Sequence, residues 1–281
     1  MIITTNQFFS LPRFGRLLQK QVTDNRGQWL TNFALLAGTM ITVAMVIATG
    51  VPQEVDNMRI AAFFIGGWAA WYTFVWQQTD HLNQKERAMS YLLQPASAFE
   101  KTLALWLITG VGFVVVYVGY FLLLDAVGVA FINNREWSAQ QLDEIRMRGG
   151  LSYIKPFYES DELADLPPFI WVLTGLLHSF ALAMLLTVRR YALAIVAVLA
   201  FVLIGAGFFL NITVANQLIS PGDVVSGKPF EGVIIRTDNP ATYYDLALPQ
   251  PFGDQLRWLV GVVVVSGLYA VAYLKLNERE V

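Results

Sequence analysis

Six long apolar stretches, separated by segments rich in polar and charged residues, dominate the pattern of this chain. Each is close to the roughly 20 residues that a helix needs to cross the hydrocarbon core of a bilayer. Inside lipid every backbone N–H and C=O must be paired within the chain, so such stretches are predicted to be helices. The predicted spans lie at about Leu30 to Val51, Ile60 to Trp76, Leu103 to Leu124, Phe169 to Val188, Tyr191 to Leu210 and Trp258 to Leu274. The pattern predicts an all-α integral membrane protein, with residues 1–281 forming a single polytopic domain of six transmembrane helices.

The first polar segment, residues 6–28, has the spacing of an amphipathic helix. Its apolar residues recur every three or four positions from Phe8 to Leu18, with basic residues between them. Ser10 is in position to cap this helix, and Pro12 stands in its first turn. A basic amphipathic helix is typical of the membrane surface, so we expect it to lie on membrane lipids. The alternative is a helix packed on the protein's own loops.

The second polar segment, residues 77–102, is too polar to span and too patterned for a plain linker. Pro95 predicts a break after a short helix. The spacing Ser97-x-x-Glu100 has the form of a capping box, which predicts that a new helix begins there and continues into the third span.

Two longer polar segments, residues 125–167 and 211–257, follow the third and fifth spans. In the first of these, residues 138–147 predict a helix that the glycine pair 149–150 ends. In the second, the apolar run at residues 232–235 predicts a short β-strand. These two segments are expected as long external loops.

Composition and charge set the orientation. The chain is 56% hydrophobic and only 14% charged, whereas soluble domains have about 25% charged residues. With the N-terminus inside, the cytoplasmic segments carry 11 basic and 6 acidic residues, and the external ones 8 and 15. Positive charge favours the cytoplasmic side, and the Arg189-Arg190 pair lies in a short hairpin where this rule is strongest. We therefore expect a multi-pass membrane protein with both termini cytoplasmic.

The chemical motifs of common enzymes are absent. The chain has no cysteine, no P-loop, no His-Glu-x-x-His pattern, no Gly-x-Ser-x-Gly pattern and no glycine-rich dinucleotide fingerprint. The predicted spans also lack Asp and Glu, which ion-coupled carriers usually need near the midplane. We expect no enzyme activity, no cofactor, no metal and no nucleic-acid partner.

One ionisable residue, His178, lies near the middle of a predicted span. An ionisable side chain in that place is a candidate for a proton relay or a transport pathway. The competing interpretation is a neutral imidazole that bonds to a neighbouring helix.

Residues 9–18 and 91–101 read FSLPRFGRLL and YLLQPASAFEK. Together with the six spans, they resemble the N-terminal region and the cytoplasmic "Leu-Pro-Ala-Ser … Glu-Lys" loop of bacterial type-2 ABC exporter permeases. Gln94 stands where that loop pattern has leucine. The resemblance implies a permease subunit of a bacterial cytoplasmic (inner) membrane. It would work as a homo- or heterodimer beside a separate ATP-binding ABC subunit, with ATP bound on that partner.

The resemblance also implies that the loop from about His81 to Lys101 couples to the ATPase. Its candidate coupling residues are Lys85, Glu86, Arg87, Pro95, Glu100 and Lys101. Two alternatives remain open at this point. One is a non-transporting membrane scaffold or sensor subunit, favoured by the long acidic external segments; the other is a secondary carrier with His178 as its relay.

Overall fold

A computed structural model describes residues 8–50, 52–83, 85–147, 150, 153–218, 224–228, 232–236, 243–247, 249 and 251–279. Six helices in the described residues are long and apolar enough to cross a membrane: Arg26–Ala48, Glu54–Asn83, Ala98–Asn133, Pro168–Thr187, Ala192–Leu218 and Gln255–Glu278. Large hydrophobic side chains along them are exposed, among them Met45, Phe201 and Val263. Exposing so much apolar surface to water is unfavourable, so these helices are expected to contact lipid, and the chain is a multi-pass membrane protein.

All six predicted spans coincide with one of these helices, but three helices run well past the predicted limits. The second covers Glu54–Asn83, the third Ala98–Asn133, and the fifth continues to Leu218. Hydropathy marks only the apolar part of a helix, whereas backbone hydrogen bonding continues through the charged residues at its ends. Asp125, expected to begin an external loop, is therefore inside a helix.

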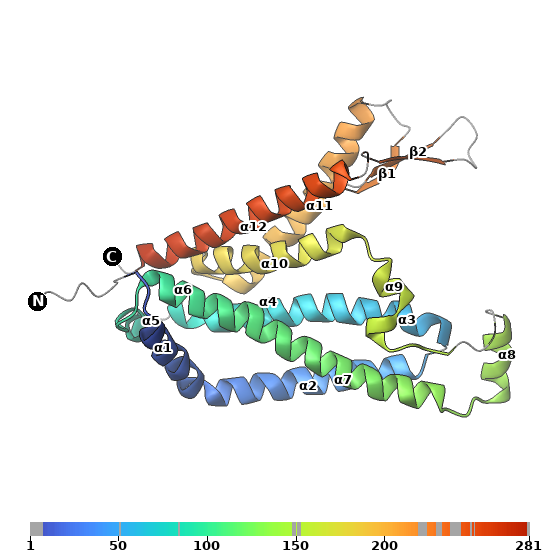
Figure 1. Cartoon of the computed structure of the whole chain (residues 1–281), viewed down its shortest axis with the longest axis horizontal. Coiled ribbons are helices and arrows are strands. Elements are labelled where there is room, and N and C mark those ends of the chain that lie inside the picture. Colours follow the sequence, from blue (N-terminus) through green and yellow to red (C-terminus); the bar gives the residue numbers. More distant parts are fainter. Residues whose placement is uncertain are drawn as a thin grey trace, which may run out of the picture. The chain divides into compact units, whose positions relative to one another are not determined.

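The chain divides into two units, and the first takes its described residues from 1–78 and 89–166 (Figure 1). Its helices are α1 (Leu11–Asp24), α2 (Arg26–Ala48), α3 (Pro52–Ala61), most of α4 (Gly67–Asp80), the last part of α5 (Lys85–Leu92), α6 (Ala98–Trp106), α7 (Phe113–Asn133), α8 (Ala139–Met147) and α9 (Asp161–Ala164). Two π-helical segments, η1 (Ala62–Gly66) and η3 (Leu107–Gly112), join α3 to α4 and α6 to α7. A 3₁₀ turn, η4, covers Phe157–Glu159.

Two small cores hold the first unit. One packs Phe14 and Leu17 of α1 against Ala104 of α6. The other packs Val55 of α3 against Val129 and further apolar residues of α7 and of the chain after α8. Helix α2 has no buried residue, although Ile47 and Ala48 at its end pack against the second core.

The second unit contains residues 79–88 and the described residues of 167–281. It holds η2 (His81–Asn83), the first part of α5, α10 (Pro168–Thr187), α11 (Ala192–Leu218) and α12 (Phe252–Glu278). Between α11 and α12 runs an antiparallel sheet of β1 (Val224–Lys228), β2 (Gly232–Arg236) and β3 (Tyr243–Ala247), in the order β1-β2-β3. The strand predicted at residues 232–235 is present, and two more pair with it, so the chain is mainly rather than purely helical.

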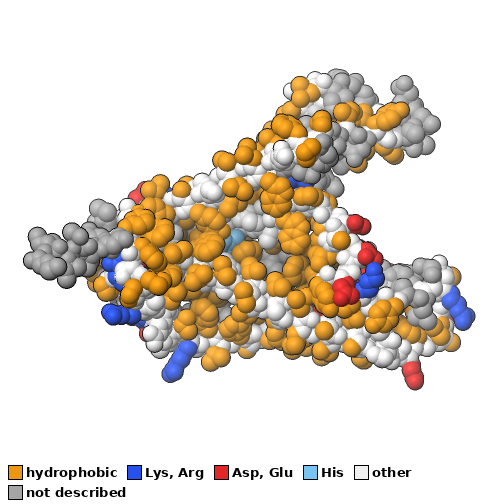
Figure 2. All heavy atoms as spheres, viewed as in Figure 1, with side chains coloured by type: hydrophobic (Ala, Val, Ile, Leu, Met, Phe, Trp, Pro, Cys, Tyr) orange, Lys and Arg blue, Asp and Glu red, His pale blue; other side chains and the backbone are white. Residues whose placement is uncertain are grey.

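Polar groups explain where several elements begin. Ser97 and Glu100 form the predicted capping box at the start of α6, and Pro95 lies in the predicted break between α5 and α6. The predicted helix after Ser138 is α8. Figure 2 shows hydrophobic side chains over most of the visible helix surface, while charged side chains gather near helix ends. This distribution is typical of a membrane protein, whose helix surfaces contact lipid and whose helix ends contact water.

Candidate functional site

The N-terminal helix is fastened to the start of α6 by one buried carboxylate. Glu100, with 0% exposure, accepts hydrogen bonds from Arg13 Nε at 2.6 Å and Arg13 Nη2 at 2.8 Å. It also accepts the backbone N–H of Ser10 at 2.6 Å and of Ser97 at 3.0 Å. The two-pronged guanidinium contact is the strong form of this ion pair. The hydrogen bond to Glu100 raises the pKa of Arg13 above its usual value.

Ser10 stands at the N-cap of α1, as predicted, but its side chain makes no capping bond. Its backbone N–H is instead bound by Glu100. The apolar face of α1 is divided: Phe14 and Leu17 pack on α6, whereas Leu11 is exposed. The alternative of a helix packed on the protein itself thus holds for part of this face, and contact with lipid stays a prediction for the rest.

The six candidate coupling residues have different surroundings. Glu100 and Lys101 are buried within the chain, and their coupling role stays a prediction. Pro95 is exposed. The side chains of Lys85, Glu86 and Arg87 lie outside the described residues, although their backbone forms the first turn of α5.

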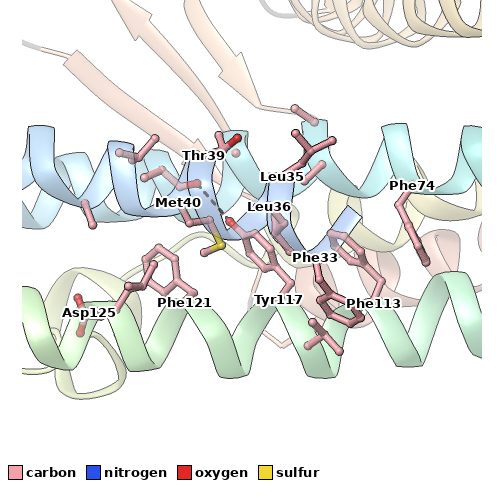
Figure 3. A pocket seen from close by; sticks show the side chains of 18 of the residues that line it. Phe33, Leu35, Leu36, Thr39, Met40, Phe74, Phe113, Tyr117, Phe121 and Asp125 are labelled. Carbon is pink, nitrogen blue, oxygen red and sulfur yellow. Dashed lines mark hydrogen bonds between the residues drawn. The ribbon is translucent and has the colours of Figure 1, made fainter. Parts of the chain in front are cut away.

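A pocket of about 430 Å³ runs between α2, the α3–η1–α4 helix and the η3–α7 helix (Figure 3). It extends along α2 from Trp29 to Ala48, a rise of about 28 Å at about 1.5 Å per residue. That length is close to the roughly 30 Å hydrocarbon core of a bilayer. Its lining residues are mostly apolar, and Arg59 and Asp125 are the charged ones among them.

A row of aromatic side chains on α7 forms one wall of this pocket. Phe113, Tyr117 and Phe121 recur every four residues and stack, with ring centroids 5.6 Å apart in the first pair and 6.4 Å in the second. Side chains four residues apart share one face of a helix, so this row follows directly from the sequence spacing.

The two π-helical segments beside the pocket are tied to the opposite helix. The Tyr117 hydroxyl donates to the carbonyl oxygen of Phe63 in η1 at 2.9 Å, and it also lies 3.3 Å from the carbonyl oxygen of Ala62. In return, Trp71 Nε1 of α4 donates to the carbonyl oxygen of Thr109 in η3. A π turn disturbs the regular helical pairing and often occurs at functional sites. Aromatic donors on facing helices thus fix the shape of the pocket wall.

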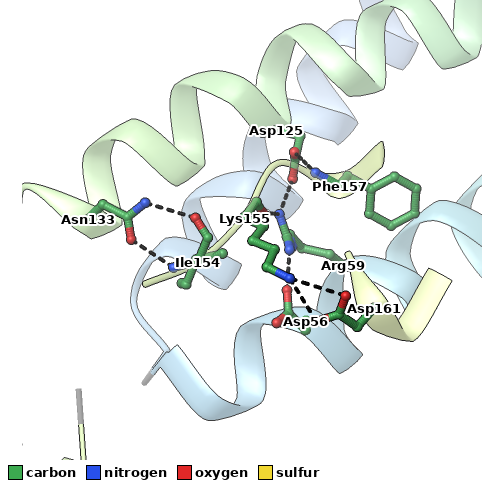
Figure 4. A network of polar contacts seen from close by, with 8 residues as sticks. All are labelled: Asp56, Arg59, Asp125, Asn133, Ile154, Lys155, Phe157 and Asp161. Atoms are coloured by element: carbon green, nitrogen blue, oxygen red, sulfur yellow. Dashed lines mark hydrogen bonds and ion pairs between the residues drawn. The ribbon is translucent and has the colours of Figure 1, made fainter. Parts of the chain in front are cut away.

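A network of charged groups, with Arg59 and Asp125 buried in the pocket wall, lies toward the end of the pocket opposite Trp29. Figure 4 shows its contacts. Arg59 Nη1 donates to Asp125 Oδ1 at 2.8 Å and to the carbonyl oxygen of Lys155 at 3.1 Å, and its Nη2 pairs with Asp56. The second oxygen of Asp125 accepts the backbone N–H of Phe157 at 2.8 Å. Lys155 itself pairs with Asp161 at 2.9 Å. These bonds hold α3, α7 and the chain after α8 together.

Sequence reasoning missed this network. Arg59 and Asp125 each fall one residue outside a predicted span and were expected in loops. A usable signal was present, because Asp125 continues the four-residue spacing of Phe113, Tyr117 and Phe121 and so belongs to the same helix face.

In the second unit, His178 is 3% exposed, and its Nδ1 lies 2.7 Å from the hydroxyl oxygen of Tyr269 on α12. The expected bond to a neighbouring helix is therefore present, and the relay stays a prediction. The described residues contain no group of three or more His, Asp or Glu placed to hold a metal ion.

No family model matches the chain, and neither the curated proteins nor the solved structures contain a significant match.

Proposed function

We propose that this chain is the membrane-spanning permease subunit of an ABC export system, driven by a separate ATP-binding subunit on the cytoplasmic side of a bacterial inner membrane. The observation that carries the proposal is the position of residues 79–102. Part of this segment belongs to each of the two units, and the boundary falls inside α5, between Ala88 and Met89. A motor that pushes on α5 therefore acts on both units.

Separate anchors hold the two parts of this segment. In the second unit, Arg279 donates to the carbonyl oxygens of Leu82 at 3.0 Å and Leu186 at 2.6 Å. Burial and the nearby charge of Arg189 lower the pKa of Arg279. In the first unit, the buried Glu100 binds the N-terminal helix to α6. A displacement of α5 is thus transmitted at both of its ends.

The first unit connects this segment directly to the pocket. α6, η3 and α7 form one continuous helix from Ala98 to Asn133. Glu100 lies in its first turn, and residues from Ile108 onward line the pocket. Because a helix transmits displacement along its axis, movement at Glu100 reaches the pocket wall. The mostly apolar lining fits an amphiphilic compound as the exported substrate.

A dimer of two permease subunits belongs to the same proposal. The small-residue positions Ser266 and Ala270 of α12 are exposed in the chain. Small residues four apart allow close helix approach in membranes. This face is therefore open to a second copy or a related subunit.

The test is purification of the native complex. Tagged wild-type chain is isolated from mild detergent, and the bound proteins are identified by mass spectrometry. We expect an ATP-binding ABC subunit with the wild type and with the control Arg146→Glu, and its loss with Lys85→Glu combined with Arg87→Glu. If no such subunit binds the wild type, or if the double variant retains it, the proposal fails.

A scaffold or sensor is the second candidate, because the small sheet exposes apolar side chains. Tyr243, Tyr244 and Leu246 of β3 are 54%, 68% and 55% exposed. Exposed aromatic and aliphatic groups on a strand are typical of a protein-binding surface. A purified complex that contains external partners but no ATPase favours this function.

A further inference from the structure

The end of the pocket away from Arg59 contains polar atoms that are buried without a hydrogen-bond partner in the described part of the chain. They are Trp29 Nε1, Asn32 Nδ2 and Gln77 Oε1. Buried polar groups in proteins are nearly always hydrogen-bonded, and leaving them unpaired is unfavourable. Three such atoms at one end of one pocket therefore point to a bound group that supplies their partners.

The helices bring these three side chains to the same place. Trp29 and Asn32 are three residues apart, which puts them on one face of α2. Gln77 comes from α4, on another wall of the pocket. The Trp29 ring packs edge-on against Phe74 of α4, with centroids 6.0 Å apart. Together they offer an indole N–H and two amides, and each amide carries both a donor and an acceptor.

The charge of the missing group follows from its surroundings. No formally charged residue lines this end of the pocket; the charged lining residues, Arg59 and Asp125, lie at the other end and are paired at 2.8 Å. An ionised head group at the Trp29 end is therefore buried without a counter-charge, which is strongly unfavourable. A neutral group that both donates and accepts, such as a hydroxyl or an amide, meets the same atoms at much lower cost.

The remainder of the pocket sets the shape of the tail. The pocket runs the length of α2 from Trp29 to Ala48 but has a volume of about 430 Å³, low in the usual range of roughly 300–1,000 Å³ for ligand pockets. A space of this length suits an extended apolar chain that lies along the row of Phe113, Tyr117 and Phe121.

We propose that this pocket binds a neutral single-chain amphiphile of the monoacylglycerol class. Its polar head binds Trp29, Asn32 and Gln77, and its chain extends toward Arg59. As the identity of the exported substrate this inference rests on the proposed function, but the binding itself needs no ATPase. The two proposals can therefore fail separately.

The experiment uses purified chain in phosphatidylcholine nanodiscs, without any partner subunit, and a monoacylglycerol with a photoactivatable chain as the probe. Cross-linked peptides are mapped by mass spectrometry, and excess monoolein or excess oleate is added as competitor. We expect labelling on α2 and α7, displaced by monoolein at concentrations at least tenfold below those that oleate requires. Labelling that monoolein does not displace, or that oleate displaces equally well, overturns the proposal.

Variants locate the head group. Asn32→Leu combined with Gln77→Met keeps the branching or length of each side chain and removes both amides, so we expect at least tenfold weaker apparent affinity for monoolein. Thr42→Val is the matched control on α2, because Thr42 bonds only within its own helix, to the Gly38 carbonyl, and does not line the pocket. Unchanged affinity in the double variant overturns the assignment. If the double variant does not elute as a folded monodisperse protein, Trp29→Phe, which keeps an aromatic ring but removes the indole N–H, tests the same assignment. The expected loss of affinity is at least threefold, and an unchanged affinity overturns the assignment.

Discussion

The Arg59–Asp125 pair gives the sharpest stability prediction. Both side chains are almost completely buried, at 5% and 3% exposure. Asp125 accepts one bond from Arg59 and one from the Phe157 backbone. Asp125→Asn keeps the shape of the side chain and removes its charge, so the variant isolates the electrostatic part of the interaction.

The expected cost follows from what remains in the variant. Removing one partner of a buried ion pair typically costs about 3–5 kcal/mol. Arg59 keeps its contact with Asp56, and the asparagine oxygen still accepts a hydrogen bond. We therefore expect the lower part of that range or slightly less, about 2–3 kcal/mol, for Asp125→Asn.

Asp161→Asn is the matched control. Asp161 pairs with Lys155, but these side chains are 80% and 52% exposed. An exposed pair contributes only about 0–1 kcal/mol because water and salt screen it. The same chemical change should thus have a much smaller effect at position 161.

The measurement is equilibrium unfolding in mixed micelles with increasing SDS, followed by far-UV circular dichroism. A double-mutant cycle with Arg59→Met should show that the double variant is less destabilised than the sum of the singles, by about 1–3 kcal/mol. The reasoning is refuted if Asp125→Asn costs less than about 1 kcal/mol, or no more than Asp161→Asn.

Two further changes test the pocket wall and the N-terminal anchor. A Cβ added at Gly67 lies 3.0 Å from the Tyr117 ring, so Gly67→Ala should cost about 1–3 kcal/mol in the same unfolding assay. Gly119→Ala is the control: a Cβ added there has no atom within 4 Å, so this change should be neutral or slightly stabilising. Equal effects of the two substitutions would contradict the packing argument. Glu100→Gln should increase amide hydrogen exchange in α1, because it removes the charge that holds the Arg13 guanidinium and the Ser10 N–H. Glu278→Gln, which removes one partner of an exposed pair, should leave exchange in α1 unchanged. If α1 stays as protected in the Glu100 variant as in the wild type, Glu100 does not anchor α1.

The number and position of the six membrane helices could be predicted because lipid leaves the chain few choices. A backbone in hydrocarbon must pair with itself, so a long apolar stretch is sufficient evidence for a helix. The capping box at Ser97 and Glu100 could be predicted for a similar reason, since both partners are local in sequence. Features that depend only on residues close together in the sequence can be predicted from the sequence alone.

The buried charges could not be predicted in the same way. Arg59 and Asp125 are 66 residues apart in sequence, and each by itself marks the end of an apolar run. Their burial depends on the pairing, which hydropathy does not contain. Glu100 shows the same limit: the capping box was local in sequence, but its ion pair with Arg13, 87 residues away on α1, was not readable from that motif.

The two ends of the pocket differ in a way that determines where its shape can change. Toward the Arg59 end the guanidinium and the Asp125 carboxylate are paired at 2.8 Å, and the contacts join three separate parts of the first unit. At the other end, Trp29 and Asn32 lie in the first two turns of α2, which begins directly after Asn25, the residue that also caps the end of α1. Since α1 is held by Glu100, a displacement of that carboxylate reaches the first turns of α2 through α1, and it also reaches the α7 wall along the α6–η3–α7 helix. Movement at the inner segment should therefore change the hydrogen-bonding end of the pocket from two sides.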